Sequence, residues 1–156
     1  MQLRELIART GGPGRVEWIG VRSARLADMD ALSGVEVALD GLAGDHARPG
    51  KRAVTLIQAE HLPVIAALAG REVTAAMLRR NLVVSGINLI ALKGRDVRIG
   101  SALLRWTTVC APCSRMELAL GHGGYAAMRG HGGWCAEVLE TGRIDIGSSV
   151  EARPLA

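Results

Sequence analysis

The residues best suited to chemistry are cysteines, two of which form the motif Cys110-Ala-Pro-Cys113. Cys113 precedes a segment with helical spacing, Ser114–Leu120, so its thiol stands at an expected helix start. Free N–H groups at a helix start and the nearby Arg115 favour an anion there, and Pro112 restricts the backbone before the thiol. We therefore predict an ionised Cys113 thiolate with a lowered pKa. The alternative is that Cys110 and Cys113 are small buried hydrophobic residues.

A zinc site is a second interpretation of the same residues. Cys110-x2-Cys113 is followed seventeen residues later by His131-x3-Cys135, which has the ligand count and loop length of a structural Cys3His site. Glycines flank His131, however, and a chain with 49% hydrophobic residues has little need of a stabilising metal. The zinc site remains an open alternative.

Two arginines and an amide form another candidate site, at a helix-to-strand turn. Arg79, Arg80 and Asn81 follow an expected short helix and precede an extended run. Guanidinium groups bind phosphate, or a planar polar ring, through two hydrogen bonds at once. We expect a cofactor contact here, or alternatively basic residues that stabilise a helix C-terminus.

A basic loop between two expected strands is the third candidate. It contains Asp45, His46, Arg48, Lys51 and Arg52. Asp45 is expected either to orient the His46 imidazole or to accept N–H groups of a cofactor. Lys51 and Arg52 are expected to bind cofactor phosphate, although solvated surface charge is the simpler interpretation.

Short strands interrupted by glycines must position these groups. Extended runs are predicted at 16–21, 34–39, 53–57, 81–84, 97–99 and 102–109, with a terminal hairpin of 134–139 and 144–150. Short helices are predicted at 1–9, 62–69, 74–78, 114–120 and 125–128. We predict a mainly β fold, a strongly twisted and largely antiparallel barrel with appended short helices (α+β).

Composition restricts the class of protein. The 156 residues are expected to form one domain over 1–156, and no apolar run is long enough to cross a membrane. A net charge of +4 favours an anionic partner, whereas 3% aromatic residues argue against nucleic acid. An odd number of cysteines without a secretory leader indicates the cytoplasm.

Four motifs in register resemble the MOSC domain, the C-terminal domain of molybdenum cofactor sulfurases. They are Gly41-Leu-Ala-Gly-Asp-His46, Arg52–Ile57, Arg79–Leu89 and Cys110-Ala-Pro-Cys113. The resemblance runs from about Val16 to Val150 and implies a twisted β-barrel. Such domains occur alone, fused to a cysteine-desulfurase-like domain, or within reductases of N-hydroxylated compounds.

The resemblance also implies roles for individual residues. The second cysteine of the motif, Cys113, corresponds to the metal ligand of the molybdenum-bearing relatives. Arg79 and Asn81 correspond to residues that contact the pterin cofactor. Arg80 stands where those relatives carry a proline, and Ala111 replaces a serine that contacts the cofactor.

The resemblance implies that Cys113 either ligates molybdenum in a molybdopterin cofactor or carries sulfur as a persulfide. The corresponding activities are molybdenum-dependent reduction of N-hydroxylated compounds and sulfur transfer. The expected partners are a cysteine desulfurase or an electron-transfer protein, and pyridoxal phosphate is not expected on this chain. The competing hypothesis is a zinc-stabilised or metal-free structural module without catalysis.

Overall fold

A closed β-barrel forms the body of the protein in the computed structural model, which describes residues 1–47 and 49–155. Arg48, part of the predicted basic loop, lies outside the described residues. The strands neighbour one another in the order β11-β7-β8-β9-β5-β6-β1, and pairing of β1 with β11 closes the ring. Their bounds are β1 Gly14–Val21, β5 Val54–Gln58, β6 Leu82–Ser85, β7 Asp96–Ile99, β8 Ala102–Val109, β9 Trp134–Glu140 and β11 Ser149–Ala152. The predicted mainly β barrel is confirmed.

One pair in the barrel, β5 with β6, is parallel, and the others are antiparallel. A parallel pair needs a crossover connection, because the chain must return to the same end of the sheet. Here the crossover consists of η1 (Ala59–His61), α2 (Leu62–Ala69) and α3 (Ala75–Leu78). The predicted helix ends are confirmed: Gly70 follows α2 with φ 69°, and the Thr74 hydroxyl accepts a hydrogen bond from Met77 N.

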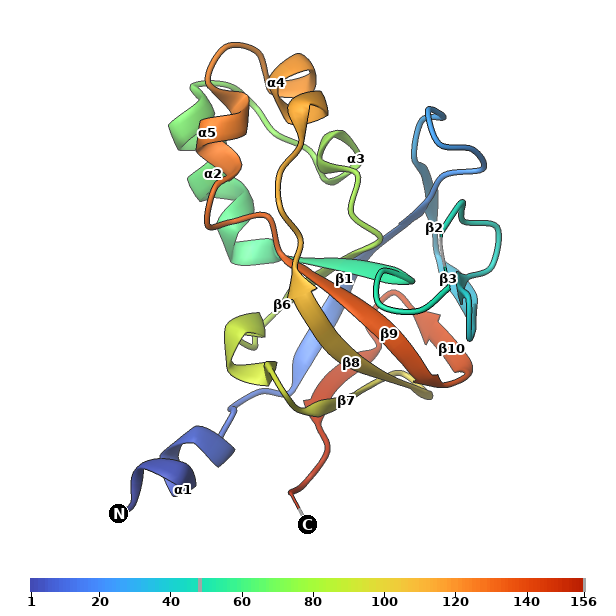
Figure 1. The fold of residues 1–156 in the computed structure, drawn as a ribbon, viewed down its shortest axis with the longest axis vertical. Coiled ribbons are helices and arrows are strands. Elements are labelled where there is room, and N and C mark those ends of the chain that lie inside the picture. The colour runs from blue at the N-terminus through green and yellow to red at the C-terminus, as the bar shows by residue number, and fades with distance from the viewer. Residues whose placement is uncertain (48, 156) are drawn as a thin grey trace.

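Two further helices join this crossover at one end of the barrel. α4 (Ser114–Leu120) and α5 (Gly124–Met128) lie beside α2 and α3, at the end away from both termini (Figure 1). A separate apolar cluster fills the space between helices and barrel, formed by Ile57, Ile65, Leu78, Val83, Met116, Leu120 and Met128. The helical end is therefore packed onto the barrel and can hold side chains in place.

A small second sheet corrects the predicted terminal hairpin. β10 (Gly142–Asp145) pairs with β3 (Gly34–Ala38), which pairs with β4 (Gly41–Leu42). The predicted hairpin of 134–139 and 144–150 is wrong, because β9 already has β5 and β8 on its two edges and offers none to β10. The predicted run 144–150 is instead divided between β10 and β11.

The remaining elements lie at the margins. β2 (Asp30–Leu32) pairs with β1, and η2 (Leu89–Leu92) connects β6 to β7. α1 (Leu3–Ala8) forms as predicted but buries none of its residues, and it projects away from the barrel near the C-terminus (Figure 1). Among the described residues, none of the helices has both the length and the apolar character needed to cross a bilayer.

Candidate functional site

Cys113 lies where the sequence predicts it, at the start of α4. It occupies the N-cap position with extended backbone (φ −127°, ψ 173°), and its side chain is exposed. β8 ends at Val109, so the intervening residues carry the chain from the barrel rim to the helix. The thiol is therefore accessible to a ligand, as the catalytic hypothesis requires.

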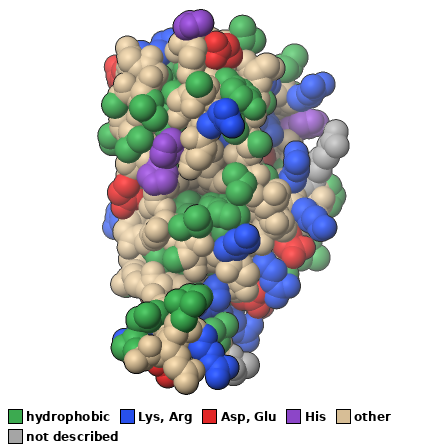
Figure 2. Space-filling model, turned by 60° about the vertical axis from the view of Figure 1, so that its left-hand side comes forward, with side chains coloured by type: hydrophobic (Ala, Val, Ile, Leu, Met, Phe, Trp, Pro, Cys, Tyr) green, Lys and Arg blue, Asp and Glu red, His purple; other side chains and the backbone are tan. Residues whose placement is uncertain are grey.

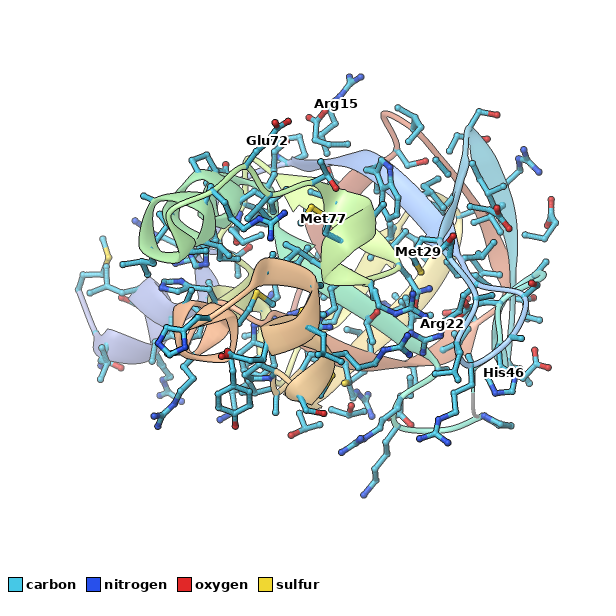
Figure 3. The ribbon with its side chains drawn as sticks, turned by 90° about the horizontal axis from the view of Figure 1, so that it is seen from above. Arg15, Arg22, Met29, His46, Glu72 and Met77 are labelled. Atoms are coloured by element: carbon cyan, nitrogen blue, oxygen red, sulfur yellow. The ribbon has the colours of Figure 1, made fainter. Side chains whose placement is uncertain are left out.

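The Cys113 thiol borders a strongly basic cavity of about 500 Å³. We call this cavity the basic cleft, and its lining residues are Arg22, Arg25, His46, Arg52, Arg79, Arg80, Cys113, Arg115 and Met116. Arg22 and His46 come from different loops and lie on the same side of the molecule (Figure 3). Among the described residues, no carboxylate belongs to this lining. The cleft is thus suited to an anionic ligand.

The carbonyl oxygen of Arg25 joins the two helices that border the cleft. It accepts hydrogen bonds from Arg79 Nη2 at 3.3 Å and from Arg115 Nη1 at 3.1 Å. Arg79 ends α3 in the left-handed conformation (φ 60°). Burial and the nearby charges of Arg115 and Arg22 lower the pKa of Arg79, because like charges crowd there. A bound anion would relieve this repulsion.

Arg80 is buried and only partly hydrogen-bonded. Its Nε donates to Gly132 O at 2.8 Å and its Nη1 to Leu78 O at 3.0 Å, whereas Nη2 is buried without a partner in the described structure. The bond to Leu78, the last residue of α3, confirms that one of the two arginines stabilises a helix C-terminus. An unpaired buried donor is costly, so a hydrogen-bond partner for Nη2 would stabilise the protein.

Asn81 and Asp45, both predicted to contact a cofactor, do not line the cleft. Asn81 is buried, and its amide donates to Gly20 O and Asp45 Oδ2 and accepts from Thr55 N and Oγ1. Asp45 Oδ1 accepts from Arg22 N at 2.9 Å rather than from its neighbour His46. These hydrogen bonds use the polar groups of both side chains within the protein. Their role here is to hold the Arg22 segment, and hence one wall of the cleft.

The basic loop contributes part of what the sequence predicts. His46 and Arg52 line the cleft, whereas Lys51 is exposed and lies outside the lining. Sequence analysis missed Arg22 and Arg25, which follow β1 and carry no motif or spacing that marks them. They reach the cleft only because the barrel brings the end of β1 beside β6.

The other two cysteines form a buried pair beneath this region. Cys110 N donates to Gly133 O at 2.8 Å, and both Cys110 and Cys135 are buried. A hydrogen bond from Cys135, reinforced by the charges of Arg80 and Arg52, lowers the pKa of Cys110 to about 6. The same contact and burial raise the pKa of Cys135. Cys110 is therefore buried, as the alternative expects, but its lowered pKa is not that of an inert hydrophobic residue. Cys113 is exposed, and its reactivity stays a prediction.

The predicted Cys3His ligand set is not assembled. Cys113 is exposed apart from the buried pair, and His131 Nδ1 lies 3.3 Å from His61 Nδ1 instead of near a sulfur. Nowhere in residues 1–47 and 49–155 do three or more His, Cys, Asp or Glu side chains gather as a metal site would require. The alternative of zinc held by Cys110, Cys113, His131 and Cys135 therefore lacks its geometry.

A second, less polar cavity of about 450 Å³ adjoins the basic cleft. The two share Arg79 and Arg115, and the less polar one adds Asp28 and an apolar lining of Met29, Ala76, Met77, Leu118 and Ala119. Together they form a surface with a charged part beside the thiol and an apolar part beyond it. Such a surface can hold a ligand with a phosphate at one end and a less charged body.

The fold and the site define a class: a closed, helix-capped β-barrel with an exposed cysteine in an arginine-lined cleft. The chain belongs to the MOSC domain family, whose model matches residues 30–151. The family is linked to molybdenum cofactor binding and to sulfur-related functions. A search of curated proteins finds no match.

Solved structures share this fold at low sequence identity. YuaD from Bacillus subtilis is 16% identical over 92% of this chain and 97% of its own, with a TM-score of 0.78. YiiM from Geobacillus stearothermophilus is 20% identical over 90% of this chain and 75% of its own, with a TM-score of 0.77. YiiM from Escherichia coli is 20% identical over 91% and 71%, with a TM-score of 0.70.

Proposed function

We propose that this MOSC domain binds a molybdenum–molybdopterin cofactor in the basic cleft, with the Cys113 sulfur as metal ligand. The observation that carries the proposal is the exposed Cys113 thiol in a cavity lined by six arginines. A thiolate is a soft ligand that accepts such a metal, and guanidinium groups match phosphate oxygens. The predicted activity is reduction of an N-hydroxylated compound.

The residues present fit this cofactor. Arg80 Nη2 and Arg22 Nε are buried, lack a partner in the described structure, and belong to residues that line the cleft. A phosphate oxygen could accept a hydrogen bond from either of these two nitrogens. When bound, the cofactor would supply a metal that changes oxidation state during reduction of a substrate.

The protein's own residues would bind and orient. Arg80 is fixed by Gly132 O and Leu78 O, so its guanidinium would bind an anion without losing side-chain freedom. Arg79 and Arg115 are held by one carbonyl at the junction with the less polar cavity, where they would contact the ligand between its charged and less charged parts. Lys51 is left as a solvated charge in this scheme.

Sulfur transfer is a second candidate, favoured by the exposure of Cys113. In this reaction the Cys113 thiolate would attack the outer sulfur of a desulfurase cysteine persulfide. The donor S–S bond would break, the donor would recover its thiolate, and Cys113 would hold the new persulfide. No cofactor is then needed in the cleft.

The test is elemental and mass analysis of one preparation from a host that makes the cofactor. Because one thiolate would ligate the metal, we expect about one molybdenum per chain. Molybdenum should be absent from Cys113→Ser and retained in the exposed control variant His122→Ala. A persulfide on metal-free Cys113 would replace the cofactor proposal with the carrier. Stoichiometric zinc that depends equally on all three cysteines would overturn both.

A further inference from the structure

A separate cavity of about 420 Å³ borders the segment that joins α5 to β9. We call it the histidine pocket, and it is lined by Gln58, His61, Asn88, Leu89, Ile90, Val109, Gly130, His131, Gly133 and Trp134. It shares no lining residue with the basic cleft. On the face shown in Figure 2, histidine and hydrophobic side chains lie side by side.

The walls of the histidine pocket are apolar and firmly held. Ile90 and Val109 leave 62% and 54% of their surface exposed, and the half-buried Trp134 adds an aromatic face. Buried Gln58 pins the η2 wall, since its Oε1 accepts from Leu89 N at 2.9 Å and its Nε2 donates to Ile87 O at 2.9 Å. An apolar cavity with few, fixed polar groups is the usual form of a small-molecule site.

Besides the amides of Gln58 and Asn88, the pocket is lined by two imidazoles in contact. The Nδ1 atoms of His61 and His131 are 3.3 Å apart and the ring centres 4.9 Å apart, so the Nδ1 edges face each other. One Nδ1–H must donate to the other Nδ1. In a neutral pair, one Nε2 is then an acceptor and the other Nε2 carries a hydrogen. Neither Nε2 has a protein partner in residues 1–47 and 49–155.

The surroundings favour a neutral His61. Burial, followed by the charge of His131, lowers the pKa of His61, and the charge of Glu60 opposes them. The Glu60 carboxylate itself is occupied, because it accepts hydrogen bonds from Gln58 Nε2 and Gly86 N. The pair therefore presents one donor and one acceptor beside an apolar surface.

We propose that the histidine pocket binds a small neutral organic molecule with an apolar body and an end that both donates and accepts a hydrogen bond, such as a carboxamide. The apolar body would lie against Trp134 and Ile90, and the polar end would hydrogen-bond to the free Nε2 atoms. This site stands independently of the chemistry proposed for Cys113.

The test is an NMR titration of the full chain with benzamide. We expect saturable binding with a dissociation constant of a few mM, typical of so small a ligand, and shifts confined to residues of the histidine pocket. His61→Ala and His131→Ala should each weaken binding about fivefold, the usual value of one hydrogen bond, whereas His122→Ala and Cys113→Ser should not change it. Benzoate, which only accepts, should bind about fivefold more weakly.

Two outcomes would overturn the proposal. One is the absence of saturation with the wild-type chain up to about 20 mM benzamide, far above the expected constant. The other is a set of shifts on the basic cleft or spread over the surface. Because both come from the wild-type protein, they hold even if a histidine variant does not fold. If the wild-type chain binds benzamide but holds no molybdenum, only the cofactor proposal is refuted.

Discussion

The basic cleft and the histidine pocket differ in charge although one backbone segment serves both. Gly132 O receives the Arg80 hydrogen bond that fixes the cleft, and Gly130, His131 and Gly133 line the pocket. Six arginines line one cavity, and the only titratable groups lining the other, within the described chain, are two imidazoles in mutual contact.

This difference shows that the charge and the hydrogen-bond partners of the polar groups in a cavity determine the class of ligand it can bind. In the cleft, like charges crowd and two buried guanidinium nitrogens lack partners, so an anion lowers the electrostatic energy. In the pocket, burial disfavours charge on the His61 imidazole, so a neutral ligand is accepted at lower cost.

The largest expected effect on stability is at the shared segment. A Cβ at Gly133 would lie 1.9 Å from Leu56 O, and φ is 85°. We expect Gly133→Ala to lower the free energy of unfolding by about 4 kcal/mol, because both the backbone angle and the contact with β5 must change. Urea unfolding measures this. Gly130→Ala is the matched control, since φ is 83° but nothing lies within 4 Å, and it should cost about 1 kcal/mol. Equal costs would show that the segment is not held against β5.

The cysteines should separate stability from reactivity. Cys135 is buried in the barrel wall and Cys113 is exposed. We expect Cys135→Ser to cost about 2 kcal/mol of unfolding free energy, because a hydroxyl replaces a buried thiol. Cys113→Ser should change it by less than about 0.5 kcal/mol, as surface substitutions usually do. Comparable losses for both would instead support the zinc-stabilised module.

Arg80 tests the charge of the cleft. We expect Arg80→Met to weaken binding of inorganic phosphate about tenfold, because a buried charge-assisted donor is lost. Isothermal titration calorimetry at low salt measures the dissociation constant for phosphate. Arg105→Met is the matched control, since Arg105 pairs with Asp96 on the surface, away from the cleft. An equal loss in both variants would mean that phosphate responds only to net charge.

The smallest effect is the pH dependence of the histidine pair. Because the folded pKa of His61 is below the ordinary value of 6.5, the unfolded chain binds more protons between the two values. The contribution of neutral His61 to the free energy of unfolding is therefore full above pH 6.5 and is lost as the pH falls below that value. We expect wild type to lose more unfolding free energy than His61→Gln between pH 7.5 and 5.5. The lowered pKa of Glu60 acts below its ordinary value of 4.5 and leaves this window unaffected. A greater loss in His61→Gln would contradict the neutral pair.

Local sequence signals determined most of the elements. Spacing and end signals that act within a few residues predict three features. They are helix α2 with its end at Gly70, the N-cap at Thr74, and the position of Cys113 before α4. The cysteine motif and the basic turn of Arg79 and Arg80 were likewise visible in the chain, because their residues are adjacent.

Tertiary structure decided which residues share a site. Arg22 and Arg25 reach the cleft, and His61 meets His131, through strand pairings that join distant segments. The predicted hairpin fails for the same reason, since both edges of β9 were taken by partners that periodicity does not specify. Asn81 could be recognised as a polar residue at a turn, but only the closed barrel shows that its amide is used by Thr55, Gly20 and Asp45. Spacing along a chain constrains local geometry, whereas the pairing of distant strands depends on the energy of the whole barrel.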